Sequence, residues 1–226
     1  ASAAGLSAVF WSYLPIAFGM SVEQINVFFD RLISWQFVET QGGVSALYYS
    51  MRLIHLPIAL ISTALITVLY PMFARLAAEE NDSLLTDRLV NALQVTLFLT
   101  VPAAIGLIVI GPQVIELLFQ RGEFGAESTL RTAQCVLYYA PSVAIMSMNM
   151  AIVRVFQAKH DHLTPVKLGL ASVCVNLTLN LLLVQLVQES GLSLAIALSA
   201  LFSLCLLSTF SKSSRLDPLL HTGVRW

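Results

Sequence analysis

Charged side chains are scarce in this 226-residue sequence: Asp, Glu, Lys and Arg make up only 11% of it, against roughly 25% in soluble domains. Hydrophobic residues reach 57% and the mean hydropathy is +0.79. Five stretches carry no charged residue at all: Leu53–Ala74, Leu89–Ile115, Thr132–Val153, Leu168–Gln188 and Ser190–Ser211. A helix needs about 20 apolar residues to cross ~30 Å of hydrocarbon. These stretches exclude a soluble protein and predict an integral membrane protein.

Further absences exclude other functions. The net charge of -1 provides no basic excess for binding nucleic acid. The three cysteines, Cys135, Cys174 and Cys205, lie inside apolar runs without metal-like or disulfide-like spacing, so we expect small buried side chains. No nucleophile–base pair, phosphate loop or pair of catalytic carboxylates is present, so the sequence does not indicate an enzyme or a cofactor. The first residues do not resemble a signal peptide, and we expect the chain to begin partway through a longer protein.

The predicted fold class is all-α, a polytopic transmembrane bundle of about six helices. The expected spans cover residues 13–38, 46–74, 88–118, 128–157, 165–188 and 192–211, followed by a cytoplasmic tail or a link to further helices over 212–226. The first span has an alternative placement over 1–22. Prolines 102, 112 and 141 are the expected kink sites of the long third and fourth spans.

The basic residues predict the orientation of the chain. If the N-terminus is cytoplasmic, the inside segments hold eight Lys and Arg and the outside loops hold only Arg121 and Arg131. The positive-inside rule then places both ends of this chain in the cytoplasm.

Polar residues at membrane depth are the candidate functional residues, because an ionisable group there costs about 2.5–3.5 kcal/mol on insertion scales. Glu23, Asn26 and Asp30 follow an i, i+3, i+7 spacing and share one helix face, while Arg52 and His55 share a face of the second helix. A cation in a cavity attracts an anionic substrate, and a carboxylate stripe binds a cation or a proton.

A structural interpretation stands beside the functional one. Asp30 and Arg52 can simply pair with each other, or with helices outside this chain. Asn176 and Asn180, at i, i+4 on the fifth helix, are typical of amides that hold helices together. Arg31 is expected on another face of its helix, snorkelling outward or meeting a partner outside this chain.

Several segments resemble the MurJ (MviN) family of bacterial lipid II flippases, in the family's order and over nearly the whole chain. They are Ser21–Asn26, Ala46–Pro57, Leu69–Pro71, Leu118–Phe124, Phe156–Ala158, Thr164–Lys167 and Asn176–Leu182. The resemblance implies the C-terminal lobe of a two-lobed transporter in the multidrug/oligosaccharidyl-lipid/polysaccharide exporter superfamily, in the bacterial inner membrane. It also implies membrane lipids and a missing N-terminal lobe as partners. The cargo it implies is lipid II or a similar undecaprenyl-pyrophosphate-linked molecule.

The same resemblance assigns roles to individual residues. Arg52 stands where the family keeps a cavity arginine, whereas Met51 and His55 replace two carboxylates of the relatives' pattern. Some relatives have a sodium site to which Asp30 and Asn176 would correspond. Asn180 replaces an aspartate of that site and Ile196 a threonine, which removes oxygen ligands that a hard cation prefers. The membrane potential, worth about 2.3 kcal/mol per charge per 100 mV, is the alternative driving force.

Three hypotheses therefore remain open. The chain is one lobe of a lipid II flippase that works by alternating access. Alternatively, it belongs to an exporter of another lipid-linked oligosaccharide or a small molecule. The third hypothesis is a membrane scaffold that transports nothing and whose polar residues only hold helices together.

Overall fold

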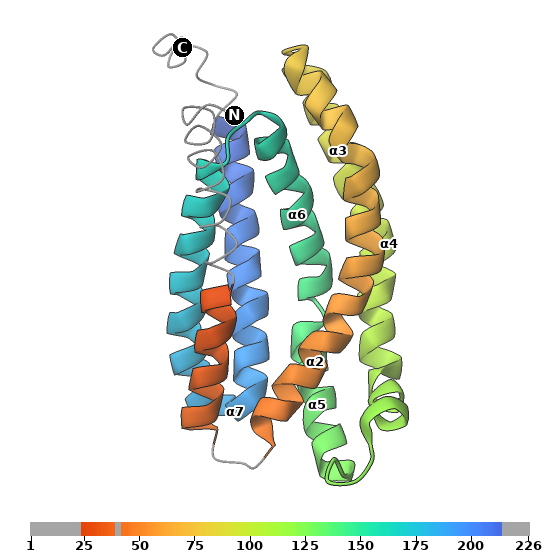
Figure 1. Ribbon diagram of the computed structural model, residues 1–226, viewed down its shortest axis with the longest axis vertical. Coiled ribbons are helices and arrows are strands. Elements are labelled where there is room, and N and C mark those ends of the chain that lie inside the picture. Colours follow the sequence, from red (N-terminus) through yellow and green to blue (C-terminus); the bar gives the residue numbers. More distant parts are fainter. Residues whose placement is uncertain (1–23, 39–41, 214–226) are drawn as a thin grey trace, which may run out of the picture.

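The structure is a computed structural model that describes residues 24–38 and 42–213, and the secondary structure of this part of the chain consists of helices joined by short turns (Figure 1). The first helix covers residues 24–37. The elements that follow are α2 (Gly43–Pro57), the π-helical turn η1 (Ile58–Ser62), α3 (Thr63–Ala78), α4 (Asp82–Phe119), α5 (Ala126–Tyr139), α6 (Ser142–Ala158) and α7 (Leu163–Ser213). The prediction of an all-α membrane bundle is confirmed. Glu23 and the tail after Ser213 lie outside the described residues.

The element α7 is a helical hairpin rather than one rod. Its 51 residues would measure about 77 Å as a straight helix, far more than a bilayer. The backbone leaves helical geometry at Val187 and Gln188, where Gln188 takes a left-handed φ of 52°. The two halves then lie side by side (Figure 1), and the Asn176 amide of the first half donates to the Ser199 hydroxyl of the second. These halves correspond to the fifth and sixth predicted spans.

The other long helices cover most of the residues of the second, third and fourth predicted spans, and the division into six spans stays a prediction. Gly43–Ala78, Asp82–Phe119 and Leu163–Phe210 are each long and apolar enough to cross a membrane, and α5 and α6 pass the same test only together, as a pair bent by 46° at its break. The bend lies next to Pro141, one of the expected kink sites, whereas Pro102 and Pro112 lie inside the continuous helix α4.

The second span contains an irregularity that its sequence does not predict. Its π-helical turn directly follows Pro57, whose missing N–H interrupts the hydrogen-bond ladder of the helix.

The connections alternate between the two ends of the bundle, as consecutive antiparallel spans require. Figure 1 shows the α3–α4 and α6–α7 turns at the upper end, while the α4–α5 turn and the turn inside α7 lie at the lower end. Arg75, Arg88 and Lys159 belong to the upper end and Arg121 to the lower one. The positive-inside rule would place the upper end in the cytoplasm, and this orientation stays a prediction.

Three hydrophobic clusters hold the helices together. The first joins α3, α4, α6 and α7 around Phe73 and Phe156, and the second joins α2, α4, α5, α6 and α7 around Ile54 and Tyr139. The third, in the lower half, joins the helix over 24–37 to α2 and α7 and includes Leu47. The α7 hairpin and the α2–α3 span diverge toward the upper end (Figure 1), and a cavity lies between them.

The outer surface is apolar. Phe98 and Leu117 of α4 are 77% and 79% exposed, as expected of side chains that face lipid. Among the cysteines, Cys135 is fully buried, but Cys174 and Cys205 are exposed. The expectation of buried cysteines is therefore wrong for these two, because their apolar runs supply the outer surface of the hairpin as well as its core.

Candidate functional site

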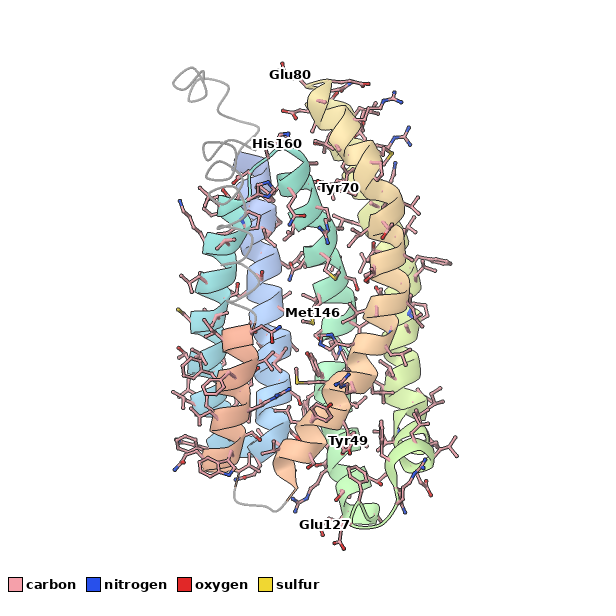
Figure 2. The ribbon with its side chains drawn as sticks, in the orientation of Figure 1. Tyr49, Tyr70, Glu80, Glu127, Met146 and His160 are labelled. Atoms are coloured by element: carbon pink, nitrogen blue, oxygen red, sulfur yellow. The ribbon has the colours of Figure 1, made fainter. Side chains whose placement is uncertain are left out.

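Two adjoining cavities of about 620 and 440 Å³ lie inside the bundle. They share four lining residues: Asn26, His55, Met146 and Ile196. Figure 2 places Met146 at mid-height of the bundle, where the two cavities meet. The larger cavity, which we call the upper cavity, runs from there between α6 and α7 to Arg154 and Gln157 near the upper end. The smaller, lower cavity lies between the helix over 24–37 and α2.

Arg52 lines the lower cavity and is held by one neighbour on its own helix. Its Nε and Nη2 donate hydrogen bonds of 3.1 and 2.7 Å to the Tyr48 hydroxyl, one turn earlier. Its guanidinium carbon is also 5.1 Å from the centroid of that ring. The ion pairs within the described residues involve other side chains, so here no carboxylate of this part of the chain neutralises Arg52. The proposed pairing of Asp30 with Arg52 is thus not formed.

His55 and Asn26, which come from two different helices, lie at the junction of the two cavities. The side-chain amide oxygen of Asn26, Oδ1, is buried and has no hydrogen-bond partner within the described part of the chain. A buried amide oxygen without a partner costs about 1–3 kcal/mol, and at a cavity wall it can accept a hydrogen bond from cargo or water. Glu23, the third member of the predicted stripe, lies outside the described residues.

Asp30 takes part in a buried network with α7. Asp30 is only 2% exposed, and its Oδ1 accepts a hydrogen bond of 2.5 Å from the Asn180 amide. The same amide donates to Asn176 Oδ1 at 2.9 Å, and the Asn176 amide donates to the Ser199 hydroxyl at 3.2 Å. The network joins the helix over 24–37 to both halves of the hairpin. The expectation that Asn176 and Asn180 connect helices agrees with these contacts.

The arrangement fits a sodium ion poorly. A cation here would need Oδ1 of Asp30 and Oδ1 of Asn176 as ligands, but these two atoms already accept hydrogen bonds from the Asn180 NH2 group, while the buried Oδ1 of Asn180 has no partner within the described residues. The opposite orientation of this amide would place its oxygen against the Asp30 carboxylate, so the carboxylate determines the orientation. Ile196 lines the cavities without an oxygen ligand, although Ser199, one turn further, supplies a hydroxyl to the network. Within the described residues, the Asn180 NH2 group lies between the two oxygens that a cation would need as ligands.

Some residues of the site were missed or misplaced at the sequence level. Arg31 was expected on another face, but it lines the lower cavity, and its guanidinium carbon is 5.9 Å from the Tyr48 ring. Tyr48 was not singled out, although its i, i+4 spacing from Arg52 was a usable signal. Nothing in the sequence pattern indicated that Arg154 and Gln157 would line the upper cavity.

Comparison with known proteins places this geometry in context. A family model described as "Lipid II flippase MurJ" matches residues 2–222. The chain is 28% identical over 198 residues to a probable lipid II flippase MurJ of Rickettsia prowazekii, covering 87% of this chain and 38% of that protein. It is 32% identical over 182 residues to the corresponding protein of Rhizobium meliloti, covering 80% of this chain and 34% of the relative.

A solved structure has the same fold. The structure titled "Lipid II flippase MurJ, inward closed conformation" superposes with a TM-score of 0.77 at 24% identity, covering 86% of this chain and 41% of that one. The chain thus spans about two-fifths of the length of these relatives. At this identity the superposition establishes the arrangement of the helices and not the role of any side chain.

Proposed function

The chain belongs to the MurJ lipid II flippase family, and from this we propose that it is one lobe of a protein that moves lipid II, or a similar polyprenyl-diphosphate-linked cargo, across the bacterial inner membrane. The second wall of the transport path comes from the remaining three-fifths of the protein, which we infer from the partial coverage of the relatives. The lobe contributes a binding surface and moves against its partner lobe by alternating access. Catalysis is not part of this function.

One observation carries the proposal: an arginine that no carboxylate of the described residues neutralises lines a cavity inside an apolar bundle. An unneutralised cation at membrane depth is costly unless an anion or water compensates for it. A diphosphate group carries negative charge and presents several acceptor oxygens. A planar guanidinium can donate hydrogen bonds to two of these oxygens at once. Arg52 is held toward the cavity by Tyr48 and is therefore oriented for such a contact.

We infer that the membrane potential, rather than sodium, drives the cycle in this protein. The oxygens of Asp30 and Asn176 are engaged by the Asn180 amide, and the described network contains a single carboxylate. Arg52 adds a charge whose movement relative to the field contributes energy of about 2.3 kcal/mol per 100 mV for a full crossing. Transport by the full-length protein should therefore be unchanged when choline replaces sodium.

Complementation tests the proposal. The full-length protein carrying Arg52→Ala should fail to support growth of a strain depleted of its own lipid II flippase, while reaching normal levels in the membrane. Arg121→Ala is a matched control, because Arg121 is an exposed loop residue that donates to the Leu118 carbonyl. Normal growth with Arg52→Ala would remove this residue from the mechanism. If Asp30→Ala and Asn176→Ala lower the amount of protein in the membrane but leave transport per molecule unchanged, the network of Asp30, Asn176 and Asn180 only holds helices together, as the scaffold hypothesis states.

A further inference from the structure

We infer that Arg31 and Arg52, which both contact Tyr48, form one anion site, and that together they bind the two phosphate groups of the cargo's diphosphate. The inference rests on the proposed function and adds a second binding residue to it. It assigns to Arg31 the role of a cargo-binding cation and to Tyr48 that of a positioning residue.

The contacts of Tyr48 bring the two cations together from different helices. Arg52 reaches the tyrosine from its own helix, with two hydrogen bonds to the hydroxyl. Arg31 reaches the same ring from the helix over 24–37. Their guanidinium carbons lie 5.1 and 5.9 Å from one centroid and so within about 11 Å of each other. A diphosphate with a hydrogen bond at each end can span this separation, since each arginine adds the reach of its own N–H groups.

Both guanidinium groups retain donors for a ligand. A guanidinium has five N–H donors, and Arg52 uses two of its nitrogens on the Tyr48 hydroxyl. Arg31 and Arg52 are both exposed side chains that line the same cavity. The contact of Arg31 with Tyr48 is a cation–π contact with the ring, which leaves the N–H edge of the guanidinium available for an anion.

The position of Arg31 argues against simple snorkelling. The helix over 24–37 ends and α2 begins at the lower end (Figure 1), with Arg31 six residues before residue 37 and Tyr48 five residues after Gly43. A snorkelling arginine would extend along its helix toward that end. Arg31 instead turns sideways onto Tyr48, into the cavity that Arg52 also lines.

The charges around this cavity favour an anion. Besides the two arginines, its charged lining within the described residues is Asp30, and this carboxylate is 2% exposed and engaged with the Asn180 amide. Met51 and His55, also in the lining, carry no negative charge. Two exposed guanidinium groups therefore face one buried carboxylate, which leaves an excess of positive charge at the cavity surface.

Binding measurements on the purified full-length protein test the inference, with undecaprenyl diphosphate and undecaprenyl monophosphate as probes. Arg31→Ala should weaken binding of the diphosphate about tenfold or more and binding of the monophosphate by less than about threefold, because a single phosphate can be held by Arg52 alone. Arg31→Lys should retain part of the affinity, since it keeps the charge and loses the bidentate geometry. Arg52→Ala should weaken binding of both lipids, and Arg121→Ala of neither.

The outcomes separate this inference from the proposed function. Loss of binding in Arg52→Ala with wild-type affinity in Arg31→Ala would overturn the role of Arg31 and leave the function standing. Wild-type affinity in both variants would overturn the site and with it the central observation of the proposed function. Equal losses for both lipids in Arg31→Ala, together with a lowered unfolding temperature and no recovery in Arg31→Lys, would show a purely structural arginine.

Discussion

Replacing Asn180 by aspartate should turn a sodium-indifferent network into a sodium-dependent one. In the structure the Asn180 NH2 group lies between two acceptors, 2.5 Å from Asp30 Oδ1 and 2.9 Å from Asn176 Oδ1. Asn180→Asp replaces this donor with an oxygen, so that two carboxylates and an amide oxygen converge at one buried point. Such a group of oxygens repels itself when empty and suits a hard cation.

The size of the effect follows from the contacts that are lost. Two charges about 4 Å apart repel by about 4 kcal/mol at an effective dielectric constant of about 20. The two hydrogen bonds of the Asn180 amide contribute about 1 kcal/mol each. The free energy of unfolding should therefore fall by about 4–6 kcal/mol in the absence of sodium. A sodium concentration of about 100 times the dissociation constant would restore about 2.7 kcal/mol of it.

Thermal unfolding of the purified full-length protein measures this effect. At pH 8, the wild type should unfold at the same temperature in sodium chloride and in choline chloride of equal ionic strength. Asn180→Asp should unfold at a lower temperature in choline and recover part of the loss in sodium. Asn149→Asp is a matched control, because the Asn149 amide donates to the Ala200 carbonyl and not to a carboxylate. It should be destabilised without a response to sodium. A wild type that sodium stabilises, or an Asn180→Asp protein as stable as the wild type in choline, would refute this reasoning.

Two further predictions concern the hairpin. A Cβ added at Gly191 would lie 2.4 Å from the Leu183 carbonyl oxygen, whereas Gly169 has open space around its Cα. Gly191→Ala should therefore lower the free energy of unfolding by about 3 kcal/mol or more in denaturant unfolding. Gly169→Ala should leave it unchanged or raise it by up to about 1 kcal/mol, because alanine favours a helix interior. Equal losses in the two variants would contradict the close approach of the two halves. Glu189, 6% exposed at the hairpin turn, has its Oε1 4.0 Å from Arg131 Nε. Glu189→Gln should lower the free energy of unfolding by about 1–2 kcal/mol and therefore lower the unfolding temperature. An unchanged unfolding temperature would show that this pair contributes nothing.

The helices could largely be predicted from the sequence, because the bilayer imposes a simple length requirement on each span. Charge-free stretches such as Leu89–Ile115 fall within the observed helix α4. The sequence predicts a link over Glu189–Gly191, where Glu189 and Gly191 interrupt two apolar runs, and the backbone leaves helical geometry just before it, at Val187 and Gln188. The π-helical turn after Pro57 was not predicted, because Pro71, Pro102 and Pro112 lie in α-helix without such a turn and the sequence does not distinguish them.

The candidate site was predictable in part. Helical spacing predicts that Asn26 with Asp30, and Arg52 with His55, share helix faces, and all four residues line the lower cavity. Spacing describes one helix at a time, however, and the contacts that distinguish these residues come from other helices. Asp30 meets Asn180 on α7 rather than Arg52, and Arg31 crosses to Tyr48. Long arginine side chains can turn away from the face on which their Cα lies, which is why the position of Arg31 could not be deduced.

The most direct test of the central claim is the transport of a fluorescent lipid-linked diphosphate sugar by the full-length protein reconstituted in liposomes. The account predicts a loss of about 100-fold or more in initial rate for Arg52→Ala, partial activity for Arg52→Lys and wild-type rates for Arg121→Ala, since an arginine–phosphate hydrogen bond pair contributes about 3 kcal/mol. A wild-type rate in Arg52→Ala, with the protein correctly inserted, would contradict the claim that this lobe binds the cargo through its cavity arginine.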